Sequence, residues 1–174
     1  MLNTILIIIA ILFALPFIMA LFVKKDYHIE REVIINMPKH EVFDYLKYIK
    51  NQDNYNKWTM LDPDMEKDFR GTDGNVGFIY AWDGNKNAGA GEQEITGITD
   101  GERITMELRF IRPFASIGHA YMSTEAESEH STKVKWGMYG KTSYPRNIMN
   151  LVMGGVLGKN IQESLNLLKR ILEK

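Results

Sequence analysis

The sequence predicts an α+β protein in which one curved antiparallel sheet is covered by a long C-terminal helix and preceded by an apolar helix. Three observations carry this prediction: 23 initial residues without a charged side chain, a series of alternating strand patterns from Met65 to about Tyr144, and an amphipathic stretch over 146–173. An antiparallel sheet with one polar face needs an apolar cover on its other face. The terminal stretch supplies that cover.

The N-terminal stretch has the length and composition of a membrane-spanning helix. Residues 5–23 carry no polar side chain, and at ~1.5 Å per residue they span roughly 28 Å, close to the ~30 Å hydrocarbon core of a bilayer. A cleaved signal peptide is the competing interpretation. No basic residue precedes the apolar run, however, the run is too long, and no small-x-small cleavage site closes it. Pro16 is compatible with a membrane helix. We therefore expect residues 1–25 to be an uncleaved single-pass anchor.

Charges at the end of the apolar run predict the orientation of the chain. Lys24 and Lys25 follow the run directly, and the positive-inside rule places them on the cytoplasmic side of the membrane. Asp26 offsets part of this signal. The first strand pattern begins two residues after the lysines, so the domain over 26–174 is expected to lie on the cytoplasmic side, directly against the membrane.

The domain begins with a strand and a helix. Residues 27–35 become rich in β-branched side chains, which favours a strand. Pro38 opens a helix at its first turn, and that helix continues with apolar residues at helical spacing, namely Val42, Phe43, Leu46 and Ile49. The polar run over 51–57 ends it, and Trp58 follows.

The central part of the chain alternates between strand and turn patterns. Turns are indicated by Asp73-Gly74, Asp83-Gly84-Asn85 and Asp100-Gly101. Between and after them the sequence predicts strands over 76–82, 91–98, 104–110, 119–128 and 133–139. In the clearest of these, apolar residues alternate strictly with Thr105, Glu107 and Arg109, which predicts one buried and one solvated face.

The C-terminal stretch predicts a long amphipathic helix. Its apolar positions recur at helical spacing and comprise Met149, Val152, Met153, Val156, Leu157, Ile161, Leu165, Leu168 and Leu172. Gly154, Gly155 and Gly158 lie inside it, and each costs about 1 kcal/mol relative to Ala in a helix. Close packing of the helix backbone against the sheet is the expected reason for them; a kink or space for a ligand are the alternatives.

Composition excludes several classes of function. The formal net charge is −1 with mixed signs along the chain, so nucleic-acid binding has no electrostatic support. The absence of cysteine removes disulfides, thiol catalysis and thiolate metal sites. The four histidines are scattered without the spacing of zinc ligands, and no phosphate-binding or dinucleotide-binding loop matches. We expect neither a metal nor a cofactor.

The element order and several segments resemble a known family. The matching segments are YAWDGN (80–85), GAGEQEI (89–95), LRFIRP (108–113), TKVKWGMYG (132–140) and ESLNLLK (163–169). Together these segments resemble the polyketide cyclase/dehydrase and lipid-transport family of the START and birch-pollen-allergen superfamily (SRPBCC). No single segment is specific, but their order covers nearly all of 27–174. The membrane anchor lies outside the family pattern.

The resemblance implies a helix-grip fold, in which a seven-stranded antiparallel sheet is wrapped around the C-terminal helix with a cavity between them. Members typically bind a hydrophobic small molecule such as a lipid, sterol, quinone or polyketide, and some are cyclases. With the strand alternation, this predicts a cavity lined by Trp58, Tyr80, Trp82, Gln93, Ile95, Met106, Leu108, Phe110, Met122, Trp136, Met138, Met149, Val152, Met153 and Val156. A filled core made of the same residues is the alternative.

The polar strand residues provide little support for catalysis. The candidates are Glu92, Gln93, Glu94, Arg109, His119 and Glu125. Alternation places all of them except Gln93 on the solvated face of the sheet, and an amide is no general base. No catalytic residue is therefore assigned.

Three functions remain open at this stage. The first is a membrane-tethered, non-enzymatic module that binds a hydrophobic small molecule. The second is a cyclase or dehydratase acting on a lipophilic substrate, and the third is a regulatory or assembly domain with a filled core that acts through its surface. The sequence leaves the ligand and the oligomeric state open.

Overall fold

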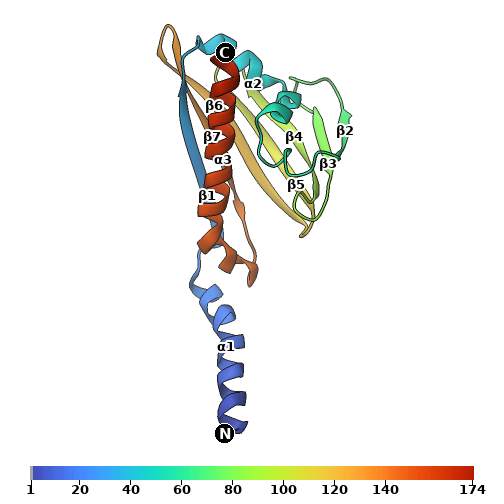
Figure 1. Cartoon of the computed structure of the whole chain (residues 1–174), viewed down its shortest axis with the longest axis vertical. Coiled ribbons are helices and arrows are strands. Elements are labelled where there is room, and N and C mark those ends of the chain that lie inside the picture. The colour runs from blue at the N-terminus through green and yellow to red at the C-terminus, as the bar shows by residue number, and fades with distance from the viewer. Residues whose placement is uncertain (1) are drawn as a thin grey trace.

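The computed structural model describes residues 2–174 and places an extended apolar helix below a curved sheet (Figure 1). Helix α1 (Leu2–Phe22) leads almost directly into strand β1 (Asp26–Ile35). Helix α2 (Lys39–Lys47) and the 3-10 helix η1 (Ile49–Asn54) follow. The remaining elements are β2 (Glu66–Arg70), β3 (Ile79–Asp83), β4 (Ala90–Thr99), β5 (Arg103–Arg112), β6 (Ser116–Ser128), β7 (Ser131–Lys141), η2 (Arg146–Met149) and α3 (Asn150–Leu172).

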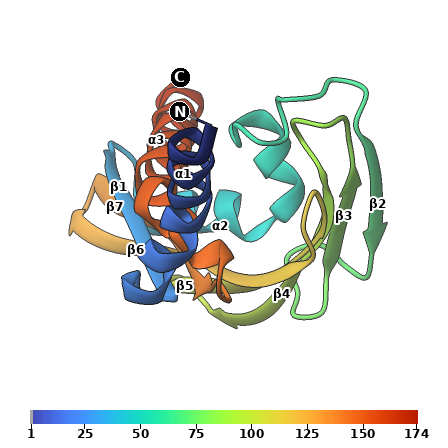
Figure 2. The same cartoon turned by 90° about the horizontal axis from the view of Figure 1, so that it is seen from below.

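The seven strands form one antiparallel sheet in the order β1-β7-β6-β5-β4-β3-β2. Strands β2 to β7 are therefore neighbours in chain order, and β1 completes the sheet beside β7. Viewed from below, the sheet curves around α3 and α2 (Figure 2). Register shifts at Ala90/Gly91 and Ile95/Gly97 in the β4–β5 pair are bulges of the kind that increase bending and twist. The predicted helix-grip fold, a seven-stranded sheet with a long C-terminal helix, is confirmed.

The C-terminal half of α3 and the short helix α2 fill the concave face of the sheet. Ile161, Leu165 and Leu168 of α3 have no exposed surface, because their helical spacing puts them on one stripe facing the sheet. Phe43 and Leu46 of α2 are equally buried. This packing makes one continuous core of sheet and helices.

The first helix of the domain ends at Lys47, before the polar run over 51–57 that was predicted to end it. Tyr48 is extended, with φ −85° and ψ 104°, and the backbone N–H groups of Ile49 and Lys50 donate to the carboxylate of Asp73, at 2.8 and 3.2 Å. Asp73 thus caps the start of η1 instead of letting α2 continue.

The three glycines of α3 differ in their surroundings. A Cβ added at Gly154 or Gly155 would meet nothing within 4 Å, whereas one at Gly158 would lie 2.3 Å from the guanidinium of Arg31. Close packing, the expected reason for all three, therefore holds for Gly158 alone, because the N-terminal half of α3 is not covered by the sheet.

This difference predicts unequal effects of the same substitution. Gly155→Ala is expected to raise the free energy of unfolding by about 0.5–1 kcal/mol, since Ala is the better helix former and nothing opposes its methyl group. Gly158→Ala is expected to raise it by less, because its methyl group must displace the guanidinium of Arg31, the end of an exposed side chain. Urea unfolding of both variants in mild detergent, followed by tryptophan fluorescence, measures the two values. An equal effect of both substitutions would contradict the description of α3.

The junction between α1 and the domain is held by side chains of the η2 region. Asn147, which is fully buried, donates from Nδ2 to the backbone carbonyls of Ala20 (2.6 Å) and Val23 (2.8 Å). These carbonyls belong to the last turn of α1 and its exit, where helical partners run out. The helix, over Asn3–Phe22, is long and apolar enough to span a membrane.

Candidate ligand cavity

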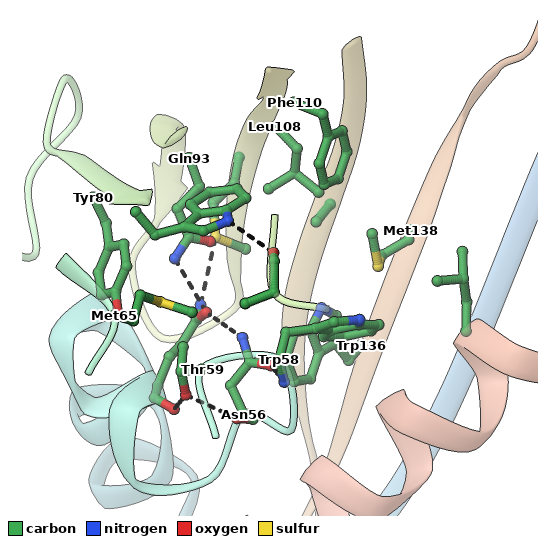
Figure 3. Close-up of a pocket in the computed structure, with 16 residues that line it drawn as sticks. Asn56, Trp58, Thr59, Met65, Tyr80, Gln93, Leu108, Phe110, Trp136 and Met138 are labelled. Atoms are coloured by element: carbon green, nitrogen blue, oxygen red, sulfur yellow. Dashed lines mark hydrogen bonds between the residues drawn. The ribbon is translucent and has the colours of Figure 1, made fainter. Parts of the chain in front are cut away.

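A cavity of about 140 Å³ lies between the inner face of the sheet, the η1 region and α3 (Figure 3). Most of its surface is apolar. Its lining consists of Gln52, Asn56, Trp58, Thr59, Met65, Tyr80, Trp82, Ala88, Gln93, Met106, Leu108, Phe110, Ala120, Trp136, Met138 and Leu157.

Strand alternation explains why the sheet presents these side chains to the cavity. Along β5, every second residue from Met106 to Phe110 points inward, and the register sets Gln93 of β4 beside Leu108. The same register pairs Ala120 of β6 with Met106 on one side and Met138 of β7 on the other. The inner face of the four strands β4–β7 thus forms one wall.

Aromatic rings narrow the space. The rings of Trp58 and Trp136 meet edge to face at 6.2 Å between centroids, and those of Trp82 and Phe110 do so at 6.1 Å. Edge-to-face contacts are a favoured geometry for aromatic pairs. The cavity is consequently smaller than the ~300–1,000 Å³ of typical pockets for drug-sized ligands.

A cluster of amide side chains forms the polar part of the wall. The Oε1 atom of Gln52 accepts hydrogen bonds from Asn56 Nδ2 (3.0 Å) and Gln93 Nε2 (3.2 Å), as Figure 3 shows. All three side chains are more than nine-tenths buried. Amides both donate and accept, so this cluster offers hydrogen bonds in either direction to a neutral polar group.

Tyr80 is the titratable side chain of the lining, and it remains protonated at neutral pH. Burial, together with a 2.6 Å hydrogen bond from its hydroxyl to Asp53, raises the pKa of Tyr80 far above its usual value of 10.0. Asp53 in turn lies 3.0 Å from the ammonium of Lys67. Tyr80 is therefore a hydrogen-bond donor committed to Asp53 and not a base.

The structure brings nine of the fifteen predicted cavity residues together in the lining. They are Trp58, Tyr80, Trp82, Gln93, Met106, Leu108, Phe110, Trp136 and Met138. Ile95 and Met122 face the same side but are packed in the core, each 1% exposed. The hydroxyl of Tyr55 lies 3.6 Å from the sulfur of Met122, so the η1 region fills the space before it.

The four predicted residues at the start of α3 lie outside the lining. Met149, Val152 and Val156 are exposed, and Met153 is half-buried. At ~100° per residue, Val152 and Val156 lie on the side of α3 that faces away from Leu165 and the sheet. Leu157 faces inward and is the residue of this helix that reaches the cavity.

The residues that the sequence did not predict come mainly from irregular segments. Gln52, Asn56 and Thr59 lie in and after η1, Met65 and Ala88 in loops, and Ala120 and Leu157 in regular elements. A 3-10 helix and its exit show no strand or helix periodicity, and polar residues are usually exposed. The one signal in the sequence was Ala120, because a small side chain at an inward-facing strand position leaves space in front of the sheet.

Apart from Gln93, the polar strand residues considered for catalysis lie on the opposite face of the sheet. Arg109 binds Glu92, Glu94 and Glu107 there, with N–O distances of 2.6–2.8 Å. His119 stacks on Tyr139 at 5.2 Å between ring centroids, and Glu125 pairs with Lys135 at 2.7 Å. Among residues 2–174 no cluster of three or more His, Asp or Glu side chains is arranged to hold a metal ion.

The ion-pair network predicts a pH-dependent contribution to stability. Hydrogen bonds from Arg109 and Arg70 hold the pKa of Glu92 below its usual value of 4.5. A lowered folded-state pKa means that the stabilisation is present above the unfolded-state pKa and is lost as the pH falls through the folded-state pKa. We expect Glu92→Gln to lower the free energy of unfolding by up to ~1 kcal/mol at neutral pH, and by almost nothing once Glu92 is protonated.

Urea unfolding of the wild type and Glu92→Gln at neutral and acidic pH tests whether the ion pairs of Glu92 contribute to stability only when it is ionised. The matched control is Glu66→Gln, which changes an exposed carboxylate of β2 for which no ion pair within 4 Å is found in residues 2–174. The same loss for Glu92→Gln at both pH values would rule out the assigned role of the network.

Solved structures with the same fold include Bet v1-like (SRPBCC) proteins. Norcoclaurine synthase from Thalictrum flavum has a TM-score of 0.62 at 8% identity, over 84% of this chain and 86% of that one. The Zhui aromatase/cyclase from Streptomyces sp. R1128 has a TM-score of 0.61 at 12% identity, over 85% of this chain and 94% of that one. Ara h 8.0201 has a TM-score of 0.57 at 12% identity, over 84% of this chain and 97% of that one.

No family model matches the sequence, and no curated protein sequence matches it either. The likeness is therefore one of architecture, carried by the sheet order and the C-terminal helix. The chain has the helix-grip fold of these Bet v1-like proteins, with an additional apolar helix at its N-terminus.

Proposed function

We propose that this protein is a membrane-tethered module that binds a small hydrophobic molecule between its sheet and α3. Residues 1–25 are the anchor in this proposal, and residues 26–174 are the binding domain. The observation that carries it is a largely apolar cavity in a helix-grip domain that follows a potential membrane-spanning helix almost without a linker. The lysines Lys24 and Lys25 place the domain on the cytoplasmic side by the positive-inside rule.

The lining favours a neutral ligand with at least one hydrogen-bonding group. Among the described residues, the cavity wall contains no Asp, Glu, His, Lys or Arg, and an ion would lose its hydration there without a counter-charge. The amide cluster of Gln52, Asn56 and Gln93 is suited to a carbonyl or hydroxyl group. Quinones, sterols, polyketides and neutral lipids all fit this description.

The size of the cavity favours a single ring or a comparable part of a larger molecule. An apolar cavity of ~150 Å³ holds one benzene molecule, and the present one measures about 140 Å³. Norcoclaurine synthase, which has the same fold, was solved in complex with dopamine and hydroxybenzaldehyde. These single-ring compounds support a ligand of this scale.

An enzymatic function, as a cyclase or dehydratase, is the second candidate and rests on the likeness to the Zhui aromatase/cyclase. Such chemistry needs groups that transfer protons at the substrate. The described lining offers Tyr80, whose pKa is raised by burial and by Asp53, together with amides and hydroxyls. Binding is therefore the better supported function.

Native mass spectrometry of the full chain tests the proposal. The protein is purified in mild detergent, and spectra are recorded before and after incubation with a total membrane lipid extract. A discrete bound mass that survives detergent removal is expected, and its value gives the class of ligand. Spectra with only unbound protein in both conditions would contradict the proposal and favour a filled core that acts through its surface.

A further inference from the structure

Exposed apolar side chains gather at the end of the domain that is nearest to α1. The register pairs Asp26 with Lys141, Gly140 with Gly118, and Ser116 with Phe110. The start of β1, the end of β7 and the β5–β6 turn therefore share one end of the sheet, and the N-terminal end of α3 lies there too (Figure 1). We define the apolar rim as Ile111, Phe114, Ile117, Leu151, Val152 and Val156, each 56–64% exposed.

The apolar rim continues the surface of α1. A groove at the junction is lined by Met19, Phe22 and Val23 on one side and by Leu151 and Gly154 on the other. Since a Cβ at Gly154 would meet nothing within 4 Å, the α3 side of this groove is open. The apolar surfaces of the anchor helix and the domain thus meet in this groove, whose lining also includes Lys24, Asp26, His28 and Asn150.

Hydrogen bonds fix this arrangement. Besides the two bonds from Asn147 to the end of α1, Asn150 Nδ2 donates to the carbonyls of Lys24 (3.0 Å) and Lys25 (3.1 Å). The backbone N–H of Thr142 donates to the Lys25 carbonyl at 2.8 Å. These bonds join the domain directly to the end of α1, so in this arrangement the depth of α1 in a membrane sets the depth of the apolar rim.

The charges at this end suit the surface of a bilayer. Four basic residues lie close to the junction between α1 and the domain: Lys24, Lys25, Lys141 and Arg146. The start of β1 contributes one acidic residue, Asp26. The guanidinium of Arg146 lies 5.9 Å from the ring centroid of Phe114, so a cation lies beside an exposed aromatic ring of the apolar rim. Apolar side chains flanked by basic ones are typical of segments that lie in the membrane interface.

We propose that the apolar rim is embedded in the lipid bilayer, so that the domain sits partly within the interface and its cavity adjoins the acyl chains. This inference rests on the proposed anchoring by α1. Leu157, which lines the cavity, directly follows Val156 of the rim in α3. Phe110, which also lines it, lies at the same end of β5 as Ile111 of the rim but on the opposite face of the strand. A ligand whose polar ring occupies the 140 Å³ cavity leaves its remaining apolar part in the bilayer.

The absence of cysteine in the chain makes a single-label test direct. Phe114→Cys and Val152→Cys place an NBD fluorophore on the apolar rim, and Glu129→Cys places it in the β6–β7 turn at the opposite end of the sheet. The full chain is reconstituted into vesicles of phosphatidylcholine and phosphatidylglycerol. Quenching is measured with iodide in the water and with doxyl groups on the lipid acyl chains.

Several-fold stronger quenching by doxyl lipids at positions 114 and 152 than at 129, with protection from iodide, is the expected result. Iodide quenching at 114 and 152 equal to that at 129 would overturn the inference. Protection from both quenchers would also overturn it, because a second copy of the chain would then cover the rim.

A label at Ile11→Cys, in the middle of α1, separates this inference from the proposed anchoring. Doxyl quenching at position 11 together with iodide quenching at 114 and 152 would mean that the chain is anchored while the rim stays in water. A failure of the label at 11 to be quenched by lipid, or of the protein to float with the vesicles, would remove the anchor itself.

Discussion

Leu165→Ala is expected to lower the free energy of unfolding by about 2–5 kcal/mol, because it deletes a fully buried side chain where α3 meets the sheet. This loss of unfolding free energy includes both the transfer free energy of the deleted side-chain atoms and the cost of the cavity that they leave. Since a domain of this kind has a total stability of roughly 5–15 kcal/mol, the variant is expected to be close to unfolding at physiological temperature.

The measurement is urea unfolding in mild detergent, followed by tryptophan fluorescence, since all three tryptophans belong to the domain. Val156→Ala is the matched control, because Val156 lies on the same helix with 60% exposure; its effect is expected to stay within ~0.5 kcal/mol. Equal effects of the two substitutions would mean that the C-terminal half of α3 is not held against the sheet as described.

Ala120→Leu is expected to weaken ligand binding strongly while leaving the fold intact. Ala120 lies on the inner face of β6, 3% exposed, between Met106 and Met138. Three added carbon atoms enter a cavity of only about 140 Å³, and overpacking typically costs ~1–3 kcal/mol. A ligand competes for the same space, so its affinity is expected to fall roughly tenfold or more.

The fraction of protein that carries the bound mass in native mass spectra measures this effect. Ala126→Leu is the control, since it makes the same change at an exposed position of the same strand. Thermal unfolding shows whether Ala120→Leu is still folded under the assay conditions. Undiminished binding by a folded Ala120→Leu variant would place the ligand outside this cavity.

Strand alternation was the reliable part of the sequence analysis. Because side chains alternate strictly between the two faces of a strand, the pattern around Thr105, Glu107 and Arg109 placed Met106, Leu108 and Phe110 on the inner face without further information. The same rule assigned Gln93, Trp136 and Met138. The predicted helix-grip fold was confirmed because these strands, the bends between them and the terminal helix all indicate one architecture.

The failures have two physical causes. A broad run of apolar residues in a helix does not show which of them face the neighbouring sheet. At ~100° per residue, Val156 lies on the side of α3 opposite Leu165 and Val152 lies close to that side, so both are exposed although Leu157 and Gly158 beside them are not. Gln52 and Asn56 were missed for another reason: their polarity predicted solvent, whereas the structure satisfies them by hydrogen bonds inside the cavity wall.

The amide cluster has a consequence for selectivity when the source of the ligand is the bilayer. Acyl chains are as apolar as Leu and Met side chains, so moving a greasy molecule from lipid into the cavity gains almost no hydrophobic free energy. What remains is shape and the hydrogen bonds of Gln52, Asn56 and Gln93, which the hydrocarbon lacks. The bilayer dissolves all of these hydrophobic ligands, so hydrophobicity does not distinguish one from another. The cavity therefore selects among them by the hydrogen bond to the amide cluster and by the width of the ring.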